Sequence, residues 1–136
     1  MTLFSRIING EIPSYKVAED EHFYAFLDLS PLTKGHTLVV PKLQEPEANY
    51  IFDLDDDLLS KMLVFAKKIA VAQKEVIDCK RVSVAVLGME VPHVHMHLIP
   101  LQTEKDILFS NPRLKLEPEE MAQIANSIAE ALEKKD

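Results

Sequence analysis

The sequence predicts an α+β domain in which helices cover an antiparallel sheet of about five strands. The chain has 136 residues, 47% of them hydrophobic, which suits one buried core but not two. Several short apolar or alternating stretches are bounded by glycine and proline, as strands usually are. Two longer stretches have apolar residues at spacings of three and four, which is typical of amphipathic helices.

The first half of the chain is expected to form a short helix and three strands. Residues 3–9 favour a helix that ends at Gly10, because glycine is the usual residue just past a helix end. The alternating and apolar stretches predict strands over three ranges: 15–18, 23–29 and 36–40.

The second half is expected to contain a long central helix, two strands and a C-terminal helix. Asp55 precedes the long helix as an N-cap, and apolar residues recur at helical spacing up to about Ile77. Strands are predicted over 82–86 and 93–101, and a last helix over about 118–134. We therefore expect one domain over residues 1–136.

Composition excludes several function classes. The formal net charge is −7, from 15 basic and 22 acidic residues, so broad binding to nucleic acid is not expected. One cysteine, Cys79, cannot form an internal disulfide and fits a reducing, cytoplasmic location. No stretch approaches the ~20 apolar residues that span a membrane, and the first residues lack the apolar segment of a signal peptide.

Three of the five histidines lie within five residues, at His93, His95 and His97. On a strand, alternate side chains point to opposite faces, so the three imidazoles are expected on one face and Val94 and Met96 on the other. Two chemical uses fit such a cluster. One is metal binding, and the other is nucleophilic and acid–base catalysis at phosphorus.

His93-Val94-His95-Met96-His97-Leu98-Ile99 resembles the signature of the histidine triad family, in which histidines alternate with apolar residues. Three upstream blocks resemble that family in the same order: 4–13, 26–31 and 35–42. The resemblance covers roughly residues 3–100 and implies the family's fold. The segment 101–136 resembles the longer C-terminus of bacterial members, and no function is assigned to it.

The resemblance implies a role for each histidine of the site. His95 corresponds to the nucleophile that attacks an α-phosphorus and becomes nucleotidylated. His97 corresponds to the ring that contacts the α-phosphate and assists the leaving group. His93 and His36 correspond to a supporting pair. The implied substrate is a purine nucleotide derivative, such as a nucleoside phosphoramidate or a dinucleoside polyphosphate, with no cofactor and no metal.

The nucleotide-binding residues are also implied by the resemblance. Asp28 corresponds to the carboxylate that binds both ribose hydroxyls, although an aspartate beside Ser30-Pro31 equally predicts a turn-forming role. The apolar cleft around the base is expected to comprise Leu3, Phe4, Ile7, Phe26, Leu27 and Leu29. Family members are usually two-fold dimers, so a homodimer is expected.

The resemblance also places Gly88 and Met89, in the loop before the triad, among the nucleotide-binding residues, but this loop departs from the family pattern. Gly88 is in place, but Met89 stands where glutamine is expected and Glu90 where a serine or threonine is common. A thioether donates no hydrogen bond, and a carboxylate repels phosphate. This loop leaves one alternative to the enzyme open, a nucleotide-binding or signalling module with little catalysis. The three imidazoles leave a second one open, a metalloprotein using His93, His95 and His97.

Overall fold

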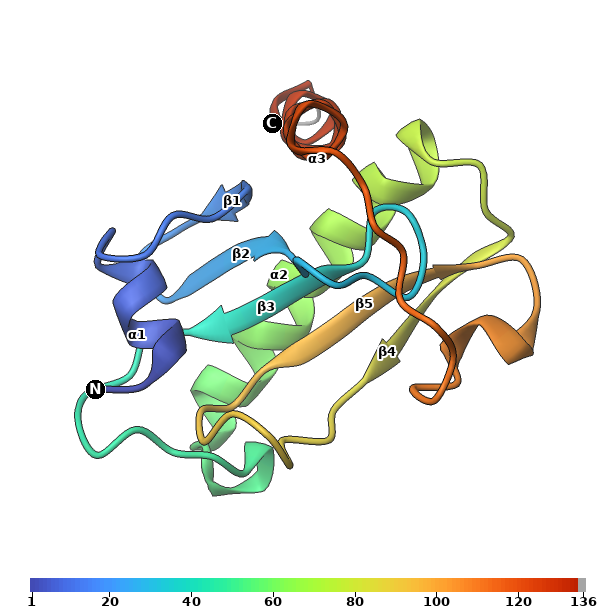
Figure 1. Cartoon of the computed structure of the whole chain (residues 1–136). Coiled ribbons are helices and arrows are strands. Elements are labelled where there is room, and N and C mark those ends of the chain that lie inside the picture. Colours follow the sequence, from blue (N-terminus) through green and yellow to red (C-terminus); the bar gives the residue numbers. More distant parts are fainter. Residues whose placement is uncertain (135–136) are drawn as a thin grey trace.

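The chain forms five strands in the spatial order β1-β2-β3-β5-β4, and all neighbours are antiparallel (Figure 1). The computed structural model describes residues 1–134, so the last two residues of the expected domain lie outside it. The strands are β1 (Lys16–Glu19), β2 (Phe23–Leu27), β3 (Thr37–Pro41), β4 (Arg81–Ala85) and β5 (Met96–Leu101).

The helices lie close to the predicted positions. They are α1 (Leu3–Ile8), α2 (Asp56–Val76) and α3 (Pro118–Glu133), with short 3-10 turns η1 (Ile51–Asp53) and η2 (Glu104–Ile107). The Asp55 carboxylate accepts a hydrogen bond from Leu58 N–H at 2.8 Å, which is the expected N-cap of α2. The predicted α+β class and the antiparallel five-stranded sheet are therefore confirmed.

The sheet separates two apolar clusters, because successive side chains of a strand point to opposite faces. In β2, Ala25 and Leu27 pack in the larger cluster with α2 and α3. Tyr24 and Phe26 pack on the other face with α1. Figure 1 shows α2 running behind the sheet, with α1 beside the ends of β2 and β3. The central strands are thus buried on both faces.

The predicted strand over 93–101 is shorter in the structure and begins at Met96. The pairing between β3 and β5 stops at Val39 and Met96. Pro41 has no N–H for a further ladder bond, and Val94 N–H instead donates to the carbonyl of Ala48 at 2.9 Å. Only His97 of the triad therefore belongs to a strand, yet Val94 and Met96 still face the core as predicted.

No helix within residues 1–134 combines the length and apolar character needed to cross a lipid bilayer.

Candidate active site

A cleft of about 590 Å³ opens on the α1 face of the sheet. This volume lies within the range of small-molecule sites in proteins. Rings of His95 and His97 border it, and the two ring centroids are 5.2 Å apart. Phe4 from α1 packs edge-on against His95 at 4.9 Å. The imidazoles of His95 and His97 therefore share one pocket, and the Phe4 ring packs against His95.

The backbone fixes the tautomer of His95. Its Nδ1 lies 2.8 Å from the carbonyl oxygen of His93, which can only accept a hydrogen bond. Nδ1 therefore bears the proton. In the neutral ring, Nε2 then keeps its lone pair and is the nitrogen left for the cleft. This arrangement suits a nucleophile.

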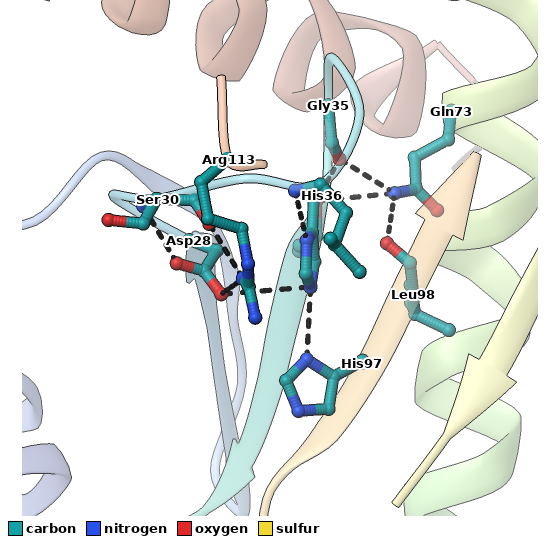
Figure 2. Close-up of polar contacts among 10 residues, drawn as sticks. Asp28, Ser30, Gly35, His36, Gln73, His97, Leu98 and Arg113 are labelled. Atoms are coloured by element: carbon teal, nitrogen blue, oxygen red, sulfur yellow. Dashed lines mark hydrogen bonds and ion pairs between the residues drawn. The ribbon is translucent and has the colours of Figure 1, made fainter. Parts of the chain in front are cut away.

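A chain of hydrogen bonds fixes the tautomers of His36 and His97 in the same way (Figure 2). Leu32 N–H donates to His36 Nδ1 at 3.0 Å, so the proton of the neutral ring is on Nε2. His36 Nε2 lies 2.9 Å from His97 Nδ1 and donates to it. His97 therefore keeps its own proton on Nε2, the nitrogen that Figure 2 shows on the side away from His36.

Burial keeps these two rings neutral near pH 7. The pKa of His36 falls to about 3, first because burial removes water and then because His97 and Arg113 oppose a further positive charge. Burial, His95 and Arg113 lower the pKa of His97 to about 4. His97 thus offers the cleft an N–H donor without a positive charge.

His93 lies behind the cleft and anchors the segment that holds His95. Its ring is fully buried, and Nε2 donates to the carbonyl of Pro41 at 2.9 Å. Nδ1 accepts from the Thr2 hydroxyl at 2.6 Å. The Glu47 carboxylate accepts from Thr2 N–H at 2.9 Å and from the Ser5 hydroxyl, and these bonds lower its pKa to about 2. This polar cluster ties α1 to the triad segment.

Asp28 has the turn-forming role and also borders the cleft, while its binding to ribose hydroxyls stays a prediction. One carboxylate oxygen accepts from Ser30 N–H at 2.8 Å, which is the turn-forming bond. The other oxygen lies 3.7 Å from His36 Nε2, and the residue borders the cleft. Burial raises the pKa of this carboxyl, while Ser30 N–H and Arg113 act in the opposite direction.

Seven of the eight other predicted binding residues line the cleft, and Leu27 does not. Leu27 is 1% exposed and packs in the cluster with α2 and α3, because it alternates with Phe26 along β2. Leu29 borders the cleft at its rim and is 67% exposed. The remaining lining residues among those predicted are Leu3, Phe4, Ile7, Phe26, Gly88 and Met89.

Two residues of the C-terminal segment complete the cleft, and sequence reasoning missed both. Phe109 packs edge-on against His97 with ring centroids 5.0 Å apart. The Arg113 guanidinium lies over the Phe109 ring at 5.5 Å, and Nη1 donates to the Ser30 carbonyl at 2.8 Å. An aromatic residue four positions before an arginine is too weak a pattern to place either residue at a site.

A metal site fits this donor set poorly. Ligand atoms of Asp28, His36 and His97 lie within 4.8 Å of one another. A metal on His36 Nε2 would move the ring's proton to Nδ1, where Leu32 N–H already donates. The alternative trio of His93, His95 and His97 meets the same difficulty, since both His93 nitrogens are already bonded.

Comparison with known proteins points to one family. A family model described as the HIT domain matches residues 9–104. A relative in Borreliella burgdorferi, named an uncharacterized HIT-like protein, is 37% identical and covers 93% of this chain and 95% of its own length. An adenosine 5'-monophosphoramidase of Schizosaccharomyces pombe is 33% identical, and the match covers 93% of this chain and 95% of that protein.

Solved structures agree with these relatives. A HIT-like protein of Bartonella henselae superposes with a TM-score of 0.82 at 30% identity, covering 96% of this chain and 95% of the other. A structure from Sulfolobus tokodaii, described as a hypothetical histidine triad nucleotide-binding protein, has a TM-score of 0.79 at 33% identity. It covers 96% of this chain and 91% of its own.

Proposed function

This chain belongs to the histidine triad (HIT) family, and from that premise we propose that it hydrolyses or transfers the nucleotidyl group of a nucleoside phosphoramidate or dinucleoside polyphosphate. The observation that carries the proposal is the tautomer of His95, whose Nε2 lone pair is left for the cleft beside His97. The relative in Schizosaccharomyces pombe is named an adenosine 5'-monophosphoramidase. A purine nucleotide is therefore the proposed ligand.

The proposed reaction has two steps. His95 Nε2 attacks the α-phosphorus, a P–N bond to the ring forms, and the bond to the leaving group breaks. An amine leaving group departs after taking a proton from solvent. Water then attacks the same phosphorus and loses a proton to solvent, the P–N bond to His95 breaks, and the nucleoside monophosphate is released. The hydrogen bond from His95 Nδ1 to the His93 carbonyl stabilises the ring while it is positively charged.

The other cleft residues are placed to bind the phosphate, ribose and base of the nucleotide during the attack. His97 Nε2–H is a preorganised donor for a phosphate oxygen, because His36 and Leu32 fix its tautomer. The free side of the Asp28 carboxylate can accept from a ribose hydroxyl. Phe4 and Phe26, which pack against each other at 5.7 Å, offer an apolar wall for the base.

Replacing His95 tests the proposal directly. The His95→Ala variant should lose at least about 1,000-fold in turnover of adenosine phosphoramidate, since no other group replaces a nucleophile. AMP affinity should change little. The matched control is His22→Ala, because the His22 side chain is partly exposed and does not line the cleft. Unchanged turnover in His95→Ala would refute the nucleophile assignment.

The structure also gives some support to a binding module with little catalysis. Met89 and Glu90 both border the cleft, and Met89 is 87% exposed. A thioether and a carboxylate have no N–H or O–H group, so neither side chain can donate a hydrogen bond to the charge that develops on the phosphate. Such a module would bind AMP but release no product from phosphoramidates or dinucleoside polyphosphates during long incubation. Rapid single-turnover formation of a nucleotidylated His95, detected by mass spectrometry, would exclude it.

A homodimer is the proposed assembly. The outer edge of β4 has no partner strand within residues 1–134, and Val84 on that strand is 51% exposed. Leu63 and Val64 on α2 are also more than half exposed. Unpaired strand edges and exposed apolar groups favour association with a second copy. Sedimentation should give twice the chain mass, and a monomer at micromolar concentration would contradict this assembly.

A further inference from the structure

The segment between η2 and α3 reaches across to the cleft and is fixed there. Leu114 N–H donates to the Pro31 carbonyl at 2.9 Å, and Arg113 Nη1 donates to the neighbouring Ser30 carbonyl at 2.8 Å. Figure 1 shows this orange-red segment crossing in front of the sheet on its way to α3. The contact joins residues 83 positions apart, so the tertiary fold places Arg113 at the cleft.

Arg113 changes the charge of the cleft. The other charged side chains that line it are the carboxylates of Asp28 and Glu90, while His97 is neutral near pH 7. Within the described part of the chain, Arg113 is the one permanently positive side chain in that lining. A phosphate group entering the cleft would otherwise meet two carboxylates and no cation.

Within residues 1–134, the guanidinium has further N–H donors near His36 that make no hydrogen bond. It has five N–H groups, and the Ser30 carbonyl accepts a hydrogen bond from Nη1. Phe109 contacts both groups: its ring centroid is 5.5 Å from the Arg113 guanidinium and 5.0 Å from the His97 ring centroid. Figure 2 shows the guanidinium beside Asp28 and His36. Nη1 is 4.0 Å from Asp28 Oδ2.

We infer that Arg113 is a substrate-binding residue whose guanidinium donates hydrogen bonds to phosphate oxygens of the nucleotide. This inference rests on the proposed function and names the group that offsets the phosphate charge. The loop before the triad cannot do so with Met89 and Glu90, whereas a guanidinium matches phosphate geometry. The C-terminal segment therefore selects anionic nucleotides over uncharged nucleosides.

Calorimetric titration with AMP and with adenosine separates phosphate recognition from general effects. Arg113→Gln should weaken AMP binding by about tenfold or more, the range expected for a lost charge-assisted hydrogen bond, and adenosine binding by less than about twofold. Lys115→Gln is the matched control, because it removes one positive charge from the same segment outside the cleft lining. It should leave AMP binding within about twofold.

Arg113→Lys provides a second variant that keeps the charge, and it should retain most of the preference for AMP over adenosine. An equal loss for AMP and adenosine in Arg113→Gln would overturn the inference, because Arg113 would then act through Asp28 or the fold. Unchanged AMP binding would also overturn it. Failure of the wild-type protein to bind AMP would refute the proposed function, and the inference with it, so the two failures are distinguishable.

Discussion

The two sides of the segment that contains the triad are stabilised in different ways. On one side, Val94, Met96 and Leu98 are at most 4% exposed and pack in the cluster with α2 and α3. On the other, His95 and His97 face a cleft, and their inner nitrogens are bonded to a carbonyl or to another ring. Apolar burial is non-directional, while these hydrogen bonds fix which nitrogen bears each proton.

Substitutions on the two sides should therefore have different effects. Removing volume from the apolar side should lower the free energy of unfolding and leave the chemistry of folded molecules in place. Changing the imidazole side should alter turnover or its pH dependence, with smaller effects on stability. The two sides alternate residue by residue, so neighbouring positions should give opposite results.

The largest effect on stability is expected from Leu98→Ala. Leu98 is fully buried, and truncating such a leucine costs about 2–5 kcal/mol through lost burial and the remaining cavity. Urea unfolding of Leu98→Ala and of His95→Ala, each compared with wild type, measures the two losses in free energy of unfolding. Turnover per folded molecule should stay within a few fold of wild type in Leu98→Ala. A stability loss in His95→Ala as large as that in Leu98→Ala would break the distinction.

A smaller effect concerns the pH dependence of stability. His97 has a pKa of about 4 in the folded chain, against about 6.5 when unfolded, because of burial, His95 and Arg113. As the pH falls below about 6.5, the unfolded chain binds a proton that the folded chain does not. The free energy of unfolding should therefore fall between pH 6.5 and 4, by up to about 1.4 kcal/mol per pH unit from this ring.

Unfolding free energies at intervals between pH 6.5 and 5 test this sign. His97→Asn should show a shallower decline than wild type, because one proton-binding difference is removed. His36, with a pKa of about 3, continues to contribute in both proteins. Leu98→Ala is the control from the apolar side, and its curve should run parallel to that of wild type. Parallel curves for His97→Asn and wild type would contradict the lowered pKa.

The sequence could predict the fold because most elements follow from local patterns. The helix from Asp56 to Val76 has both a capping aspartate and a regular apolar period, and its predicted bounds are within one residue. The start of β5 was wrong by three residues, because the end of its pairing depends on Pro41 and Ala48, which are distant in sequence. Tertiary partners, not local propensity, set that boundary.

The candidate site likewise combines residues that local patterns predict with residues that only tertiary contacts bring to the cleft. Alternation along the triad segment predicts one face for His95 and His97, and both border the cleft. The same alternation along β2 turns Leu27 toward the core, so its predicted place in the cleft was wrong. Arg113 and Phe109 could not be predicted, since the chain returns to Ser30 only after folding. The hydroxyl of Thr2 was missed for the same reason, because its partner His93 is 91 positions away.

The smallest effect is expected where the imidazole side is tied to α1. The Thr2 hydroxyl accepts from Ser5 N–H at 3.1 Å as the N-cap of α1 and lies 2.6 Å from His93 Nδ1. Thr2→Val removes both bonds and should lower the free energy of unfolding by about 1 kcal/mol. Thr2→Ser keeps the hydroxyl and should match wild type, as measured by urea unfolding. A Thr2→Val variant as stable as wild type would mean that the hydroxyl, and its hydrogen bond to His93, does not join α1 to the triad.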